Sequence, residues 1–365
     1  MTRPGSPLAS LRAAFPVLRS IAYLNAGTNG PLPTAASAAA RAELAREEEQ
    51  GRSSAAHWAR VVELTGATRA GYAALLGCSA ADVALTTSTT DGIARMLPAF
   101  DLGPGDEIVT SDEEHAGVLG PLVAQRGRGV EVRMAPFDEI ADAVGPRTRL
   151  VVCSHVSWRR GAYAPAALGE LDIPVLLDGA QGVGAVAVDI GALGVPIYAA
   201  SGQKWLCGPG GSGLLYVSPA MRERLDPPAP GYVNLAEPYA GLDASPHGDA
   251  RAYDTPAIAA ASLEQAHASL DLLGGVGWPA LHRHSAALAA TAADALREQG
   301  REVLPRDDTT LVTWRDPDPL GSVERLAAAG VVVRPLPNED LVRASFGGWS
   351  NEDDLDRLLT ALKAR

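Results

Sequence analysis

One stretch of the chain, residues 175–217, constrains the fold and the chemistry more than any other. It begins with a short apolar run, 175–177, that ends in the carboxylate Asp178. A second apolar run, 195–200, leads to a turn that carries Lys204, and a glycine-rich loop follows at 208–213. Short apolar runs bounded by glycine-rich turns are typical of buried strands. The stretch therefore predicts an acid at one strand end and a lysine on the turn after another strand.

An acid and a lysine placed in this way can together hold pyridoxal phosphate. The lysine forms a Schiff base with the cofactor, and the acid pairs with the pyridinium nitrogen, whose protonated form a buried carboxylate favours. A lysine held near other charges or away from water loses its proton easily. Lys204 and Asp178 could fill these roles, and Ser201 with the neighbouring backbone could bind the phosphate.

Two other ligand sites and one structural role compete with this interpretation. The glycines of 179–184 suggest a dinucleotide turn, but their order is GxxGxG and no acid lies about 20 positions later to hold a ribose. The loop 208–213 suggests a nucleotide P-loop, but no Lys-Ser or Lys-Thr follows its last glycine. Lys204 could also be a solvated surface lysine, as most lysines are. The spacing of these residues alone does not decide whether Lys204 binds a cofactor or is a solvated surface lysine.

The stretch resembles the cofactor site of the class V aminotransferases, fold-type I enzymes that include cysteine desulfurases, selenocysteine lyases, isopenicillin N epimerase and kynureninase. The family pattern is Asp-x-x-Gln after a strand, then Ser-x-His-Lys-Trp, then Gly-Pro-x-Gly-x-Gly. The matching residues are Asp178, Gln181, Ser201, Lys204, Trp205, Gly208, Pro209, Gly211 and Gly213. Gln203 stands where most members have histidine. Glutamine can still donate a hydrogen bond to phosphate, but it does not titrate near neutrality.

The resemblance runs from Tyr23 to Asp354 and implies an α/β fold of fold-type I. We expect a mostly parallel central sheet flanked by helices, and a smaller α+β C-terminal domain with strands at 302–304, 310–314 and 331–335. The length of 365 residues favours about two domains. A proline-rich crossing, 227–246, follows the last strand of the central stretch. We therefore expect a large cofactor-binding domain over 26–225 and a small domain over 1–25 and 226–365.

A run of hydroxyl residues, 86–90, follows a predicted strand and precedes a helix expected from about Asp91. Amides at a helix N-terminus favour an anion. In the family this turn holds the cofactor phosphate, so the resemblance implies Ser88, Thr89 and Thr90 as cofactor-binding residues. Taken alone, such residues are more often helix caps.

His115 closes the next predicted strand and matches the family histidine that lies flat against the cofactor ring. With Lys204 and Asp178 it completes the expected catalytic set, and Gln181 and Gln203 are expected to contact the cofactor. Asn25 and Gly27 resemble the family's entrance loop near the substrate carboxylate, although an ordinary turn would look the same.

Arg343 precedes a helix-starting capping box at 350–353 and matches the family arginine that grips the substrate α-carboxylate. Thr255 matches a threonine that reaches the phosphate of the partner subunit, which implies a homodimer with shared active sites. Asp254 stands at the family's glycine position, and an acid beside a phosphate is unfavourable unless it points away. Trp158 and Arg160 replace small residues, and Arg160 is expected either to be solvated or to contact an acidic substrate.

The composition of the chain limits the partners and the cellular location that we expect. The net charge of −12 and the pI near 5.1 argue against a nucleic-acid or an anionic membrane partner. The three cysteines show no metal or disulfide spacing, which suits a reducing compartment. No apolar run approaches a membrane span, and scattered arginines spoil a signal-peptide core. We expect a soluble cytoplasmic enzyme that acts on a small amino acid and binds no metal.

The resemblance implies chemistry on an α-amino acid after exchange of the Schiff base at Lys204. Desulfurases of the family need a cysteine upstream of the C-terminal arginine, and residues 301–343 contain none. We therefore expect a C–S lyase or a related β-eliminating activity without a cysteine relay. An aminotransferase, an amino-acid epimerase and a non-catalytic cofactor-binding protein remain alternatives, because family analogy is a weak warrant for the reaction.

Overall fold

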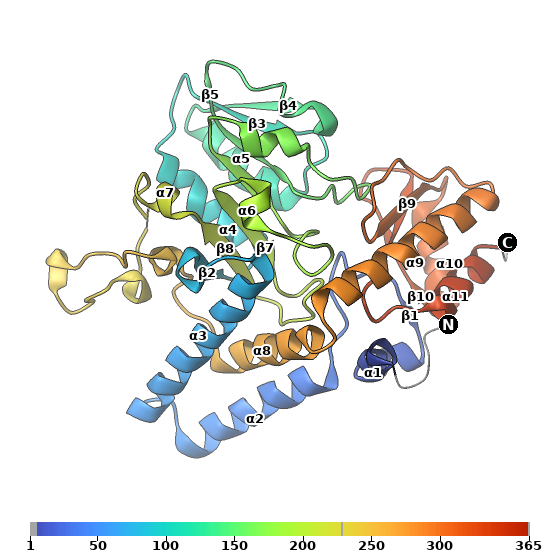
Figure 1. Ribbon diagram of the computed structural model, residues 1–365, viewed down its shortest axis with the longest axis horizontal. Helices are drawn as coiled ribbons and strands as arrows, with labels where there is room; N and C mark the ends of the chain where they lie inside the picture. The colour runs from blue at the N-terminus through green and yellow to red at the C-terminus, as the bar shows by residue number, and fades with distance from the viewer. Residues whose placement is uncertain (1–5, 228, 364–365) are drawn as a thin grey trace.

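The computed structural model describes residues 6–227 and 229–363. Figure 1 shows two lobes, one around a large sheet and one around two small sheets, with long helices beneath and between them. The large sheet has seven strands in the order β2-β8-β7-β6-β5-β3-β4. Its strands are β2 (Val83–Thr86), β3 (Glu107–Ser111), β4 (Glu131–Ala135), β5 (Thr148–Ser154), β6 (Val175–Asp178), β7 (Ile197–Ser201) and β8 (Gly213–Val217).

The large sheet is mixed but mostly parallel. The pairs β4–β3, β3–β5, β5–β6 and β6–β7 run parallel, whereas β8 runs antiparallel to both β7 and β2. Every residue of β2, β3, β6, β7 and β8 is buried. Strands that are covered on both faces read as continuous apolar runs, which is why the sequence predicted them. The predicted α/β class and mostly parallel sheet are confirmed.

Helices cover both faces of the large sheet. On one face, α3 (Ala55–Leu76) and α8 (Ala260–Gly274) pack on alternate strand residues such as Leu177. On the other face, α4 (Thr89–Met96) and α5 (Ala116–Gly127) pack on the intervening residues, for example Leu176. Neighbouring strand residues point to opposite faces, so the sheet forms the middle of three layers.

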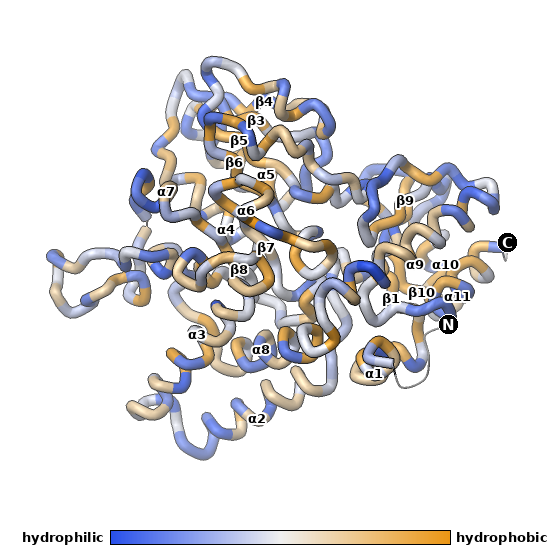
Figure 2. Tube along the Cα trace, in the orientation of Figure 1, coloured by the Kyte–Doolittle hydropathy of each residue, from blue (hydrophilic) through white to orange (hydrophobic). Residues whose placement is uncertain are grey.

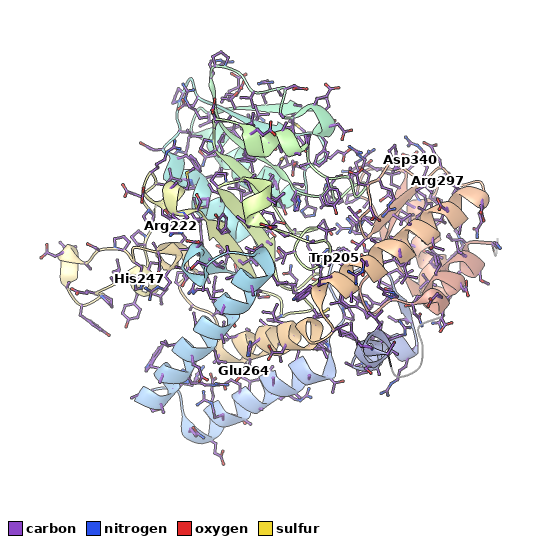
Figure 3. The ribbon with its side chains drawn as sticks, viewed as in Figure 1. Trp205, Arg222, His247, Glu264, Arg297 and Asp340 are labelled. Atoms are coloured by element: carbon purple, nitrogen blue, oxygen red, sulfur yellow. The ribbon has the colours of Figure 1, made fainter. Side chains whose placement is uncertain are left out.

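Helix α2 (Thr34–Gln50) packs against α8. The short helix α6 (Ile190–Leu193) lies between β6 and β7 in the chain, and the short helix α7 (Pro219–Arg222) follows β8. Glu264 on α8 pairs with Arg60 of α3 and so ties the two helices together. Figure 3 labels Glu264 at α8, on the side that faces α2.

The second lobe joins the two ends of the chain. Strands β9 (Leu311–Arg315), β11 (Arg334–Pro335) and β12 (Leu341–Ser345) form an antiparallel sheet in the order β11-β12-β9. Strand β1 (Ala22–Tyr23) pairs in parallel with β10 (Val331–Val332). The helices of this lobe are α1 (Pro7–Ala13), α9 (Trp278–Glu298), α10 (Pro319–Ala328) and α11 (Glu352–Lys363). The division into domains at residues 25 and 225 stays a prediction.

Three local predictions were wrong. The strand expected at 302–304 is a single bridge between Val303 and Trp314. The strand expected over 331–335 is split into two short strands, because β10 pairs with β1 whereas β11 pairs with β12. The helix expected from about Asp91 begins two residues earlier, at Thr89, since Ser88 caps it by accepting a hydrogen bond from the backbone N–H of Asp91.

Figure 2 shows apolar residues gathered in the strands of both lobes and polar residues over α2. The segment after α7 projects from the body as the yellow loop of Figure 1 and exposes the large apolar side chains of Tyr232, Tyr239 and Leu242. Within residues 6–227 and 229–363, none of the helices combines the length and the apolar character that crossing a membrane requires.

Candidate active site

A cavity of about 140 Å³ lies where strands β5, β6 and β7 end and where α4 and α5 begin. Nine of the ten predicted cofactor-binding residues line it: Ser88, Thr89, Thr90, His115, Asp178, Gln181, Ser201, Gln203 and Lys204. In parallel sheets the carboxyl ends of adjacent strands meet at one edge, so residues far apart in the sequence converge there. The tenth residue, Thr255, lies elsewhere.

Asp178 is the last residue of β6 and is buried at the base of the cavity. Its Oδ1 accepts a hydrogen bond of 2.7 Å from the backbone N–H of Ala180. Burial raises the pKa of Asp178, whereas Lys204 and the Ala180 N–H act in the opposite direction. A protonated nitrogen beside this carboxylate would favour its ionised form.

Lys204 lies on the turn after β7 and is half-buried. Burial lowers its pKa to about 8; Asp178 opposes this shift, whereas Arg343 and Arg334 add to it. The turn rests against Gly30, whose backbone N–H donates to the carbonyl of Gln203 over 2.8 Å. A Cβ at position 30 would lie only 2.2 Å from the Lys204 carbonyl oxygen, so only glycine allows this close approach.

His115 caps the N-terminus of α5. Its Nδ1 accepts a hydrogen bond of 3.0 Å from the backbone N–H of Gly117. An accepting Nδ1 places the proton of the neutral ring on Nε2. Burial lowers the pKa of His115 to about 4, and Lys204, Arg334 and Arg343 add to the effect. The ring is therefore neutral at neutral pH.

The start of α4 forms the other end of the cavity. The backbone N–H of Thr89 donates to Ser201 Oγ over 3.0 Å, and the hydroxyls of these two residues lie 2.7 Å apart. Ser88 caps the helix and Thr90 also lines the cavity. Hydroxyl groups at a helix N-terminus suit an anion, because the amides and the helix dipole favour negative charge.

Gln181 connects the cavity to the loop that carries Gly27. Its Nε2 donates to the carbonyl of Gly27 over 2.9 Å, and its Oε1 accepts from Trp205 Nε1 over 3.1 Å. Trp205 lies near the middle of the molecule, between the two lobes (Figure 3). A Cβ at position 27 would meet Arg343 Nη2 at 2.8 Å and Gln181 Oε1 at 3.0 Å. Glycine therefore permits these groups to converge.

Arg343 lies behind the cavity wall and is fully enclosed. Its Nη1 donates to the carbonyl of Trp158 over 2.6 Å, whereas its Nε and Nη2 have no partner. A buried donor without a partner is costly, so these two groups suit an anionic ligand. The predicted entrance residue Asn25 is not part of the cavity lining, and its Oδ1 accepts from the Thr28 hydroxyl over 2.8 Å.

Thr255 lies away from the cavity, beside β2. Its backbone N–H donates to the carbonyl of Leu85, and its hydroxyl accepts a hydrogen bond of 3.3 Å from Arg95. The neighbouring Asp254 points away from the cavity and binds Arg69 through both carboxylate oxygens. The carboxylate of Asp254 therefore points away from the cavity, which is the orientation expected of an acid near a phosphate site.

Arg160 takes neither of its two expected roles. Its side chain is only 11% exposed, and it pairs with Glu113 over 2.8 Å and with Asp138 over 2.5 Å. Trp158 does line the cavity, and its ring lies edge-on to His115 at a centroid distance of 5.2 Å. Trp158 therefore contributes to the site, whereas Arg160 forms ion pairs outside the cavity lining.

Glu114 and Arg334 were not predicted from the sequence as site residues. Glu114 is buried and accepts hydrogen bonds from the Ser111 hydroxyl and from both the N–H and the hydroxyl of Ser154, which lines the cavity. Burial nevertheless raises the pKa of Glu114 to about 7. The sequence feature that could have indicated Glu114 is the pair of acids before His115, Glu113 and Glu114. Only Glu114 is buried.

The residues present fit pyridoxal phosphate. The cavity joins an amine of lowered pKa, a buried carboxylate and a neutral imidazole at one end to a hydroxyl-lined helix N-terminus at the other. The side-chain oxygen of Gln203, at the cavity wall, is buried without a partner. The two ends of this amide can exchange, which presents its NH₂ group to a phosphate.

Comparison with known proteins gives consistent matches. A sequence model of the family described as Aminotransferase class-V matches residues 22–314. Isopenicillin N epimerase of Streptomyces clavuligerus is 28% identical, covering 94% of this chain and 95% of its own. Two solved structures of the protein C-DES superpose with a TM-score of 0.88 at 26% identity.

Each of the two C-DES structures covers at least 95% of this chain and 98% of its own. One is a lysine-to-alanine mutant with glycine covalently linked to the PLP cofactor. The other is the complex of this cystine C–S lyase with its reaction product, cysteine persulfide.

Proposed function

The chain belongs to the class V aminotransferase family and is a pyridoxal-phosphate-dependent enzyme, and from this premise we propose that it cleaves the C–S bond of an amino acid by β-elimination. The observation that carries the proposal is the likeness to a cystine C–S lyase over almost the whole of both chains. Fold likeness is a weak guide to reaction type, so the site must support the same chemistry.

The cysteines of the chain support a reaction without a persulfide relay. None of the residues that line the cavity is a cysteine. Burial raises the pKa of Cys78 to about 11 and also raises the pKa values of Cys153 and Cys207 well above the usual range of a thiol. Only the thiolate is a good sulfur nucleophile, so none of the three is suited to accept sulfur.

The side chains around the cavity have separate roles in the proposed reaction. When bound, pyridoxal phosphate supplies the electron sink for the substrate α-carbon. Lys204 holds the cofactor and then moves the α-proton, for which an amine with a pKa of about 8 is suited. Asp178 holds a proton at the cofactor nitrogen, and the neutral ring of His115 covers the cavity without adding charge. Residues 88–90 and Ser201 bind the phosphate.

Arg343 orients the substrate through its α-carboxylate. Its unpartnered Nε and Nη2 can make the bidentate contact that an arginine forms with a carboxylate. Because Arg343 is fully enclosed, we infer that the side chain of Trp158 shifts when the carboxylate binds. Asn25 and Gly27 belong to the loop that closes this side of the site.

We also propose a homodimer in the cytoplasm. The exposed apolar side chains of the projecting segment, Tyr232, Tyr239 and Leu242, suit a subunit interface. In this arrangement Thr255, which lies outside its own cavity, would serve the cofactor phosphate of the partner subunit. The cytoplasm is proposed from the sparse cysteines of the chain.

Absorption spectroscopy with a panel of amino acids tests the proposal. The purified protein should show a cofactor band that depends on Lys204. Mixing with S-substituted cysteines should then release pyruvate and ammonia while the original band returns. Lasting conversion to the pyridoxamine form with release of a keto acid would instead identify an aminotransferase. A protein that binds the cofactor but exchanges no α-proton in heavy water would be a non-catalytic binder.

Epimerisation is the second candidate, because the likeness to an epimerase also covers 94% of the chain. Loss of optical rotation without release of keto acid would identify it. Both reactions begin with removal of the α-proton, so they differ in whether a leaving group departs from the β-carbon.

A further inference from the structure

Arg334 and Arg343 lie side by side on the small antiparallel sheet. Arg334 of β11 is the direct cross-strand partner of Arg343 of β12. Residues directly opposite each other in an antiparallel pair project from the same face, with Cβ atoms about 4.5–5.5 Å apart. The register of this sheet therefore places two guanidinium groups next to each other.

No acid among the described residues neutralises this pair. Within residues 6–227 and 229–363, neither arginine forms an ion pair with a carboxylate. Arg334 donates one hydrogen bond of 3.2 Å to the Thr28 hydroxyl, and Arg343 donates one to the Trp158 carbonyl. Burial lowers the pKa of both, and Arg334 helps to lower that of Arg343 to about 9. Like charges directly opposite each other are destabilising.

Two nearby arginines show the usual arrangement. Arg159 pairs with Glu339 over 2.7 Å, and Arg160 pairs with Glu113 over 2.8 Å. These acids neutralise the arginines that follow Trp158 in the chain. Arg334 and Arg343, by contrast, form no such ion pair among the described residues.

Both unpaired arginines adjoin the cavity. Their Cζ atoms lie over the ring of Trp158, at 5.7 Å for Arg334 and 6.0 Å for Arg343. Trp158 itself lines the cavity. Both arginines also lower the pKa values of Lys204 and His115, so they act on the reacting end of the site. The ring offsets part of their charge, but an aromatic face is a weaker partner than an anion.

We propose that Arg334 forms a second anion subsite beside Arg343 and selects amino acids whose side chain ends in a second negative charge, such as a carboxylate. The inference rests on the proposed function, in which Arg343 binds the α-carboxylate. One carboxylate neutralises one of the two cations. A second carboxylate on the same substrate neutralises the other, and a neutral side chain leaves Arg334 without a partner.

A matched pair of thioethers tests the subsite on the holoenzyme. S-carboxymethyl-L-cysteine and S-ethyl-L-cysteine share the bond to be cleaved and differ by a carboxylate in place of a methyl group. The wild type should prefer the first by about 10- to 100-fold in kcat/KM for pyruvate release, the range of one charge-assisted hydrogen bond. Arg334→Gln should remove this preference, because it should lower kcat/KM for S-carboxymethyl-L-cysteine by about 10-fold or more beyond any change for S-ethyl-L-cysteine.

A binding measurement makes the test independent of turnover. Calorimetry should show that the wild-type holoenzyme binds glutarate about 10-fold or more tightly than pentanoate, and that Arg334→Gln binds them equally. Arg334→Lys keeps the charge and should keep part of the preference. Arg159→Gln is the matched control, because its arginine is already paired, and it should leave both ratios unchanged.

The outcomes separate the two proposals. If glutarate is preferred and this preference needs Arg334, but no thioether releases pyruvate, the elimination is wrong and the subsite stands. If both thioethers react equally and both acids bind equally, the elimination stands and the subsite is wrong. If Arg334→Gln weakens both members of each pair alike, Arg334 assists Arg343 with the α-carboxylate, which also overturns the selectivity.

Discussion

Arg69 and Asp254 form a bidentate ion pair between α3 and the segment that precedes α8. Arg69 Nη1 and Nη2 lie 2.9 and 2.7 Å from the two carboxylate oxygens of Asp254, and both residues are buried. Asp254 Oδ1 also accepts the backbone N–H of Leu85 over 2.7 Å. The pair joins residues 185 positions apart and anchors the start of β2, which leads to the phosphate end of the site.

Replacing Asp254 should strongly destabilise the protein. Asp254→Ala leaves the buried guanidinium of Arg69 and the Leu85 N–H without their partner. Breaking one side of a buried ion pair destabilises a protein by about 3–5 kcal/mol. Urea unfolding of the cofactor-free protein measures the change in free energy of unfolding.

The control is Asp294→Ala, which breaks the exposed pair of Asp294 with Arg297 on α9. Arg297 is labelled at the surface in Figure 3. Exposed pairs contribute about 0–1 kcal/mol. Equal effects of the two substitutions would show that the Arg69–Asp254 pair is not a structural anchor.

Covalent attachment of the cofactor should become faster as the pH rises through about 8. Burial lowers the pKa of Lys204 from 10.5 to about 8, so the unprotonated amine predominates above pH 8. The rate constant for reconstitution of the cofactor-free protein, followed by absorbance, should level off above this pH. Free lysine amide is the reference, and a midpoint near 10.5 in the protein would contradict the effect of burial.

Glu114 should make the stability of the cofactor-free protein fall as the pH rises. Its pKa is raised from 4.5 to about 7, so between these values the folded state binds more protons than the unfolded state. The stabilisation is complete below pH 4.5 and is lost as the pH passes 7. Relative to Glu114→Gln, the wild type should lose on the order of 2–3 kcal/mol of unfolding free energy between pH 5 and 8.

Urea unfolding at a series of pH values measures this difference. Glu48→Gln on the exposed face of α2 is the control and should run parallel to the wild type. If Glu114→Gln also runs parallel to the wild type, Glu114 is ionised over the whole range.

Arg343→Ala should impair catalysis without destabilising the fold. Loss of the contact with the α-carboxylate should raise the activation free energy in kcat/KM by about 1.5–3 kcal/mol, the range for hydrogen bonds to charged groups. Removal of a buried cation that lacks a counterion should leave Tm unchanged or raise it. Steady-state kinetics and thermal unfolding of the same sample check both parts, and an unchanged kcat/KM would remove Arg343 from the site.

The sequence alone determined the elements of the large sheet and the chemistry of its central stretch. Strands β6, β7 and β8 follow from apolar runs bounded by glycines, because a strand covered on both faces needs continuous apolar residues. Asp178 and Lys204 could be proposed as cofactor residues because such roles depend on residue type and short spacing. These signals are local, and they remain visible in one sequence.

Only the tertiary structure decided which distant residues meet. The opposition of Arg334 and Arg343 depends on the register of β11 and β12, and the burial of Glu114 depends on where β5 ends beside β3. The inward position of Trp158 and the outward pairing of Arg160 also come from packing. Such contacts join segments whose sequences carry no mutual signal. The register of β11 and β12 depends on the geometry of the turn between them and on which faces the rest of the chain buries, and neither is evident from residue type alone.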